Sequence, residues 1–413
     1  MGDLVGNAGV AKSIQPPMGS PSVHLDALRG LAAFSVFLGH WRDAFFVNYP
    51  ELGRHSLLTT VAYLVSGLGY QWVIVFFVMS GYLVGGSVLR LVGDGRWSWR
   101  TYLLSRLTRL YIVLIPALLL GGVIDWVGMH IPGTDAVYSG RSGMYSLRID
   151  VHQTLTPEVL AANTLFLQTI VLPGTEGRRP QTFGSNGPLW SLANEFWYYM
   201  AFPLLVLLLV GHRSRNEAAG EQRRGVRGWG SRAVCGVSLV AWGWFVGPGI
   251  ALLWVPWLMG VTIPYWPRFP QLGSWMRGLA IIVALALLGG ALLLGKLEHN
   301  PGSSLLLGGA VTVLIWVTVH CATAPVPAMY ARVAQRAARS SYTLYLVHMP
   351  LLIFLKALLA MPRVQPGWYV CLKGLVVIAV VLVYAQLVYE VFEKHTDRLR
   401  RWLRPYVMGQ HAA

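Results

Sequence analysis

The stretch LDALRGLAAFSVFLGHWRDAFF, residues 25–46, is long and apolar enough to cross a bilayer as a helix, yet it carries ionisable side chains. Arg29 stands near its start, and His40 follows eleven residues later. Eleven residues make about three helical turns, so both side chains share nearly one face, about 16 Å apart along the axis. Ionisable groups inside a bilayer are costly, so each needs an explanation, and one groove could contact both residues. The alternative is that Arg29 reaches the interface and His40 bonds a neighbouring helix.

Similar apolar runs recur along the chain. Hydrophobic residues make up 55% of the sequence, charged residues only 12%, and the mean hydropathy is +0.52, so the chain holds more apolar surface than one soluble core could bury. The sequence therefore predicts an all-α, polytopic integral membrane protein, a single bundle of about ten transmembrane helices. We expect spans near residues 26–47, 64–89, 107–127, 189–210, 233–247, 250–265, 278–295, 303–322, 341–361 and 367–391.

The flanking segments fix the expected orientation. Residues 1–24 lack the apolar stretch of a cleaved signal peptide and are predicted to be cytoplasmic, ahead of a transmembrane domain at 25–393 and a basic cytoplasmic tail at 394–413. Most Arg and Lys residues fall in the segments that this orientation places inside, among them a Gly-rich loop at 211–232. The net charge of +16 thus reflects topology, and we expect no nucleic-acid partner.

Two other predicted spans carry polar side chains that could perform chemistry. The run GPLWSLANEFWYY places Ser191 and Glu195 one turn apart near the outer side of the membrane, where a carboxylate could orient a histidine or bind a hydroxyl. The run SSYTLYLVHMP places Tyr345 and His348 on one face of a helix. The alternative is that Glu195 pairs with a neighbouring helix and that the tyrosine and histidine only pack.

The arginines after the second span are candidates for binding phosphate. Arg106 and Arg109 are spaced i, i+3 at the entry of the third span, and guanidinium forks suit phosphate groups. The alternative is that they only orient the chain in the membrane, which we prefer for Arg96 and Arg100. The small residues in FFVMSGYLVGG, residues 76–86, predict close helix packing. The three cysteines are widely spaced in apolar segments, so neither a disulfide nor a metal site is expected.

Taken in order, these motifs resemble the acyltransferase 3 family, whose members O-acylate bacterial surface polysaccharides, related glycans and some antibiotics. The resemblance spans residues 24 to about 393 and rests on LDALRGLAAFSVFLGH, FFVMSGYL, SRLTRLY, GPLWSLANEFWYY, SYTLYLVH and YEVFEK. It implies that His40 is essential, that Arg29 serves the same site, and that the donor is acyl-CoA, usually acetyl-CoA. Ile112 and His395 stand where relatives often have proline, which leaves the expected reacting groups untouched.

The residues and the resemblance together predict a membrane O-acyltransferase of the bacterial inner membrane, acting on a carbohydrate or glycolipid without a permanently bound cofactor. We expect His40 as general base, with Glu195 orienting it or holding the acceptor. The donor would be bound by Arg29, Arg106 and Arg109, and the substrate by Ser191, Tyr345 and His348. The rival interpretations are a secondary transporter or lipid-linked sugar flippase, and a non-catalytic scaffold.

Overall fold

The computed structural model describes residues 20–171, 179–211, 224–268, 272–298, 300–322, 324–360 and 362–409. Within these ranges the chain is helical, and its only β contact is a single bridge between Phe46 and Val364. Residues 1–19 of the predicted cytoplasmic segment and 212–223 of the predicted Gly-rich loop lie outside the described residues.

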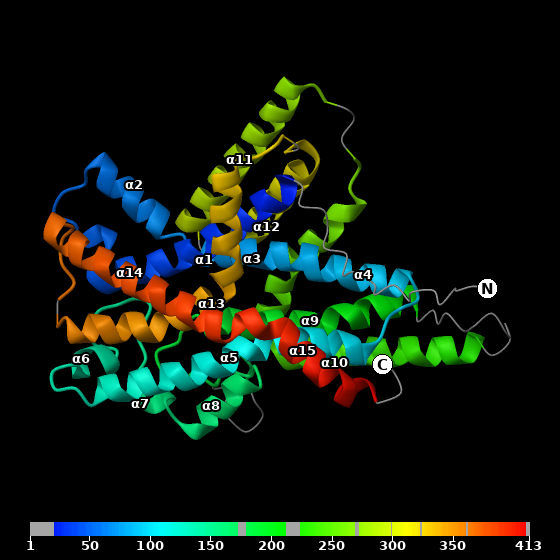
Figure 1. Cartoon of the computed structure of the whole chain (residues 1–413), viewed down its shortest axis with the longest axis horizontal. Helices are drawn as coiled ribbons and strands as arrows, with labels where there is room; N and C mark the ends of the chain where they lie inside the picture. The colour runs from blue at the N-terminus through cyan, green and yellow to red at the C-terminus, as the bar shows by residue number, and fades with distance from the viewer. Residues whose placement is uncertain are drawn as a thin grey trace, which may run out of the picture.

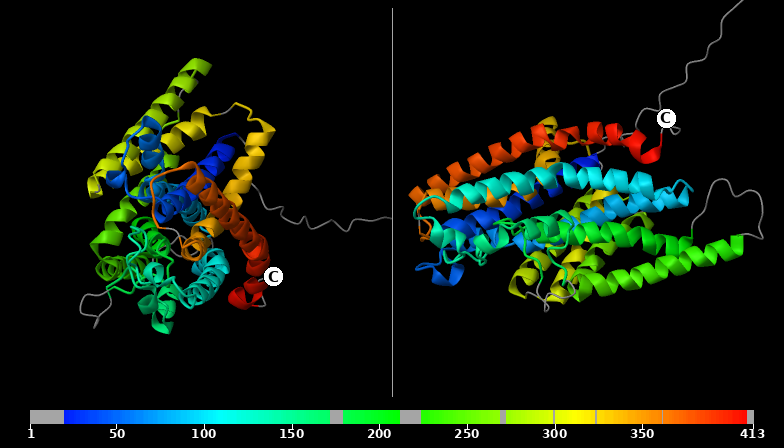
Figure 2. Two further views of the ribbon diagram at one scale, coloured as in Figure 1. Left: turned by 90° about the vertical axis from the view of Figure 1, so that its left-hand side faces the viewer. Right: turned by 90° about the horizontal axis from the view of Figure 1, so that it is seen from below.

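The longer helices share a high apolar content and run through the molecule, whereas the short ones connect them (Figures 1 and 2). Their bounds are α1 Ser20–Phe45, α2 Leu57–Ser66, α3 Gly69–Ser80, α4 Gly86–Gly93, α5 Trp99–Met129, α6 Asp135–Tyr138, α7 Val151–Thr154, α8 Pro157–Thr164, α9 Leu189–Val210, α10 Arg224–Thr262, α11 Ser274–Leu297, α12 Pro301–Cys321, α13 Ala328–Leu358, α14 Trp368–Val391 and α15 Thr396–Met408.

Eight helical stretches in the described part of the chain are long and apolar enough to cross a membrane. They are Gly69–Gly93, Trp99–Met129, Leu189–Val210, Trp229–Tyr265, Ser274–Leu297, Pro301–Cys321, Ala328–Leu358 and Trp368–Met408. An all-α polytopic membrane protein is therefore confirmed. The stretch Trp229–Tyr265 contains two helices that meet at Gly247, where φ is +75°, as the sequence predicted for its fifth and sixth spans. Helix α1 falls outside the eight because Asp26, Arg29 and its other polar residues lower its hydropathy.

Helix α1 is nevertheless held in the bundle by partners from the far end of the chain. A Cβ on Gly30 would lie 2.6 Å from the Cβ of Ala337 on α13, so the two backbones approach closely there. The indole Nε1 of Trp41 donates to the carbonyl of Gly374 on α14 (2.9 Å). Figure 1 shows α1, α5, α9, α13 and α14 running along the long axis, with α11 steeply inclined to them.

Small residues at the end of α3 pack closely against α10. A Cβ on Gly81 would lie 1.8 Å from the carbonyl oxygen of Trp257 on α10, and one on Gly260 would lie 2.0 Å from that of Val78. The prediction that this run allows close packing is confirmed. The backbone widens into a π turn over Gly81–Gly85, a feature that often accompanies functional sites.

Two predicted boundaries are wrong. The span expected over 64–89 is interrupted near its start, because α2 ends at Ser66, Gly67 bonds back to the Leu64 carbonyl, and α3 begins at Gly69. The loop expected up to residue 232 is helical from Arg224 onward. In this run arginine favours a helix and glycine disfavours one, so the sequence does not distinguish a helix from a loop.

Candidate active site

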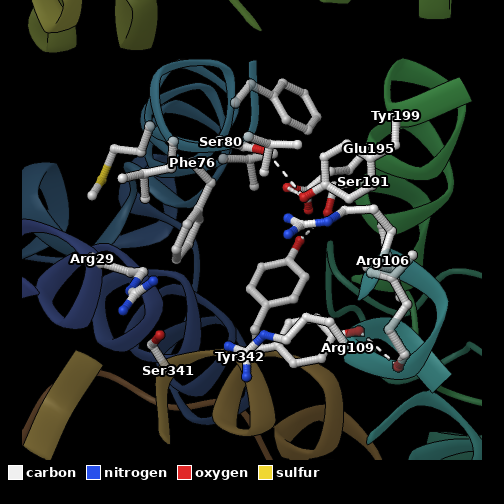
Figure 3. Close-up of a pocket in the computed structure, with 18 residues that line it drawn as sticks. Arg29, Phe76, Ser80, Arg106, Arg109, Ser191, Glu195, Tyr199, Ser341 and Tyr342 are labelled. Atoms are coloured by element: carbon white, nitrogen blue, oxygen red, sulfur yellow. Dashed lines mark hydrogen bonds between the residues drawn. The ribbon is translucent and has the colours of Figure 1, made fainter. Parts of the chain in front are cut away.

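A cavity of about 230 Å³ opens between five helices of the bundle. Apolar side chains of α3, among them Phe76 and Phe77, line it, and so do polar side chains of the adjacent helix α9. Figure 3 shows Arg29 of α1 on one side of this cavity, with Arg106 and Arg109 of α5 on the other. We call these three residues the arginine cluster. Helices α1 and α5 therefore present three guanidinium groups to one space.

The members of the arginine cluster differ in how they are held. Arg109 is bound: its Nη1 lies 2.6 Å from Oε1 of the buried Glu393, and its guanidinium lies 5.2 Å from the centre of the Tyr342 ring. Among the described residues, Arg29 forms one ion pair, a long contact of 3.4 Å with Asp26 on its own helix. In the described structure, the buried Nε atoms of Arg29 and Arg106 have no hydrogen-bond partner. These two side chains thus keep donors open for an anionic ligand.

Glu393 is itself fixed by helix α13. Its Oε2 accepts a hydrogen bond from the backbone N–H of Thr343 (3.1 Å) and another from the Thr343 hydroxyl. Glu393 lies in the short segment between α14 and α15. This segment therefore fixes the position of Arg109, which lines the cavity.

A chain of hydrogen bonds runs along the polar wall. Glu195 on α9 accepts a hydrogen bond from the Tyr199 hydroxyl one turn later. That hydroxyl lies 3.1 Å from Ser80 Oγ, which accepts from Trp257 Nε1 at 3.1 Å. The carboxylate is therefore positioned from α3, α9 and α10, and it faces the same cavity as Arg106 and Arg109.

Ser191 and Tyr345 form a second polar contact at the cavity wall. Their hydroxyl oxygens lie 2.6 Å apart, and Tyr345 also donates to the Pro188 carbonyl (3.1 Å). Asn186, just before α9, donates to the Leu346 carbonyl (2.8 Å). The start of α9 is thus bonded to the middle of α13.

His40 and His348 lie together, beside the cavity and outside its lining. Their rings stack with centroids 5.4 Å apart and an interplanar angle of 28°. His348 is completely buried, whereas His40 is partly exposed. The Tyr345 ring contacts the His348 ring edge-on at 6.2 Å, so Tyr345 connects the cavity wall to the pair of imidazoles.

Ordinary core packing does not explain so many ionisable groups in a membrane bundle. A sequence model described as an acyltransferase domain matches residues 23–386. The chain belongs to the acyltransferase 3 family. No curated protein and no solved structure matches this acyltransferase. The suspected family and the transferase class are therefore confirmed, and the roles of individual residues remain to be argued from their geometry.

The structure brings most of the predicted site residues of this acyltransferase together. Those that line the one cavity are Arg29, Arg106, Arg109, Ser191, Glu195 and Tyr345. His40 and His348 adjoin it as a pair. The Glu195 carboxylate instead bonds Tyr199 and faces the arginine cluster, so the described contacts do not join it to His40. Its role as holder of a substrate thus fits the geometry better than that of orienting the base.

Sequence reasoning missed several residues of the acyltransferase site. Tyr199 stands four residues after Glu195, so helical spacing could have assigned it to the same face. Ser80 was read only as a small packing residue. Glu393 lies in the YEVFEK motif, but its pairing with Arg109 and Thr343 could not be predicted, because both partners are distant in sequence. No cluster of three or more potential metal ligands occurs in the described ranges.

Proposed function

We propose that this acyltransferase moves an acyl group from acyl-CoA, with acetyl-CoA as the expected donor, to a hydroxyl of a carbohydrate or glycolipid. The observation that carries the proposal is the arginine cluster facing a cavity that adjoins the His40 and His348 pair. Guanidinium groups bind phosphates, and the donor carries several. The apolar wall of α3 suits the less polar pantetheine arm and the acyl group.

The separation of Arg29 and His40 supports a division of labour along α1. About 16 Å of helix axis lies between them, which is comparable with an extended pantetheine arm. Arg29 and Arg106, which keep open donors, would bind the phosphates, and His40 would meet the thioester. Arg109 would add charge to the site while Glu393 fixes its position.

The chemical step needs one base and no metal. The acceptor oxygen attacks the thioester carbonyl while His40 removes the hydroxyl proton. The bond between the acyl carbon and sulfur then breaks, an ester forms, and His40 returns the proton to the leaving thiolate to give free CoA. Glu195, Ser191 and Tyr345 supply hydrogen bonds for substrate hydroxyl groups at the cavity wall.

The function is tested by the release of free CoA from acetyl-CoA by the purified protein in lipid nanodiscs. We expect release to depend on an added polyhydroxylated acceptor and the acceptor to gain an alkali-labile ester. A secondary transporter or flippase would move its substrate without producing free CoA. Absence of release with every acceptor, in a protein shown to be folded, would refute acyl transfer.

We further propose that α15 faces the cytoplasm and that the segment between α5 and α9 faces outward, in the inner membrane of a bacterium. The distribution of Arg and Lys supports this orientation. A cysteine replacing Tyr145, which is 69% exposed, should react with an impermeant thiol reagent in intact cells. A cysteine replacing Trp402, 62% exposed on α15, should react only after lysis. The reverse pattern would invert the topology.

A further inference from the structure

His348 has a buried nitrogen with no partner, in a place where such an atom is costly. Its Nδ1 lies 2.9 Å from the carbonyl oxygen of Leu344, one turn earlier on α13. A carbonyl can only accept, so Nδ1 carries the hydrogen and Nε2 of the neutral ring is left as an acceptor. This Nε2 is buried, and no group in the described ranges bonds it.

A residue kept only for packing would not have this arrangement. A buried acceptor without a hydrogen bond has lost its bond to water and gained none in return, and a leucine of similar volume would fill the space without that cost. Unsatisfied or strained groups of this kind concentrate at functional sites, where a ligand satisfies them. The free nitrogen therefore points to a donor group that is present only when substrate is bound.

The surroundings indicate which molecule supplies that donor. His348 stacks on His40 at 5.4 Å, and its other aromatic contacts are the rings of Phe37 (5.7 Å) and Tyr345 (6.2 Å). In the proposed reaction, the attacking hydroxyl has a single proton, which it gives to His40. A hydrogen bond to His348 must therefore come from another group on the same acceptor.

We propose that Nε2 of His348 accepts a hydrogen bond from a second hydroxyl of the acceptor, adjacent to the hydroxyl that His40 deprotonates. The inference rests on the proposed acyl transfer and narrows its substrate class. Two imidazoles side by side, one acting as base and one as fixed acceptor, recognise neighbouring hydroxyl groups such as those of a sugar ring. A simple alcohol leaves Nε2 unpaired and is discriminated against for that reason.

Two variants separate this role from packing. His348→Gln keeps an acceptor near the position of Nε2 but loses the ring, whereas His348→Leu keeps the volume and removes the acceptor. The proposal expects His348→Gln to retain more activity than His348→Leu, and a packing role expects the opposite order. His130→Leu is the matched control, because His130 bonds the Trp126 carbonyl in the same way (2.7 Å) but is exposed to solvent.

The kinetic experiment uses acetyl-CoA with two probe acceptors, glycerol and 1-propanol, and follows free CoA. For the unaltered protein we expect kcat/KM to favour glycerol by roughly 10-fold to 100-fold. His348→Leu should abolish most of this preference, and His130→Leu should preserve it. A His348→Leu protein that retains the full preference for glycerol would overturn the proposal.

A measurement of thermal stability needs no acceptor substrate and tests separately whether Nε2 of His348 is unpaired. Because His348→Gln keeps an unsatisfied acceptor and His348→Leu removes it, the Tm of His348→Leu should be at least about 2 °C higher than that of His348→Gln. A Tm of His348→Leu below that of His348→Gln would mean that Nε2 already has a partner, and would overturn the inference. If no acceptor supports CoA release by the unaltered protein, the proposed function is wrong. If the unaltered protein is active, the glycerol preference of His348→Leu tests the role of His348 and leaves the proposed function standing.

Discussion

Replacing His40 with alanine should lower kcat by roughly 10²- to 10⁴-fold, because a positioned proton acceptor contributes about that much to a transition state. The KM for acetyl-CoA should change little, since the arginine cluster that binds the donor phosphates is left intact. Steady-state release of CoA by the purified variant measures both parameters. Normal turnover in a folded His40→Ala protein would disprove its role as base.

Variants of the arginine cluster should affect KM for the donor, in contrast to the kcat effect of His40→Ala. Arg29→Ala should raise the KM for acetyl-CoA with a smaller change in kcat, because it removes a contact present before and during the reaction. Arg29→Lys should restore only part of the affinity, since a point charge cannot reproduce a guanidinium fork. Arg109→Ala should also lower Tm, because it leaves Glu393 buried without its cation. An unchanged KM with lowered kcat for Arg29→Ala would assign that residue to the chemical step.

Replacing Gly81 with alanine should greatly reduce the yield of folded protein. A Cβ there would lie 1.8 Å from the carbonyl oxygen of Trp257, and helix backbone cannot move aside as a flexible side chain can. Helices α3 and α10 would have to separate, which would displace Ser80 from Trp257 at the cavity wall. Size-exclusion profiles in detergent and the Tm of any folded fraction measure the effect.

Gly86 provides the matched control five residues further along the chain. It has helical backbone angles, and a Cβ built on it meets no atom within 4 Å. Gly86→Ala should therefore be neutral or stabilising, by up to about 1 kcal/mol, because alanine restricts the unfolded chain. Equal losses for Gly81→Ala and Gly86→Ala would mean that the close approach to α10 is not what Gly81 provides.

The sequence predicts the membrane bundle well because hydropathy over twenty residues depends only on local composition. It also identifies Arg29, His40 and Glu195, because ionisable groups stand out in apolar segments. What it could not predict are relations across the chain. Nothing local shows that Arg109 is already paired with Glu393, or that His348 stacks on His40.

The ends of the helices were predicted least well, because they too depend on contacts between distant parts of the chain. Helices α5 and α13 extend beyond the apolar segments that the sequence marks, because their polar ends continue past the length needed to cross a bilayer. The break between α2 and α3 depends on Gly67, whose Cβ position would meet the Lys296 ammonium and the Tyr63 carbonyl oxygen, both at 2.8 Å. Tyr63 is one helical turn away, but Lys296 is 229 residues away and cannot be identified from the residues around Gly67.

The partnership of α1 with α13 and α14 sets a problem for biosynthesis. Trp41 and the Gly374 carbonyl that it bonds are 333 residues apart. At roughly 5–20 residues per second, a ribosome needs about 15–70 s to make that interval. During this time α1, which carries Arg29 and His40, has emerged without α13 and α14, which cover one of its sides. Until α13 and α14 arrive, α1 can pack only against earlier partners such as α3, and ribosomes that stall before residue 328 would release chains in which one side of α1 stays uncovered.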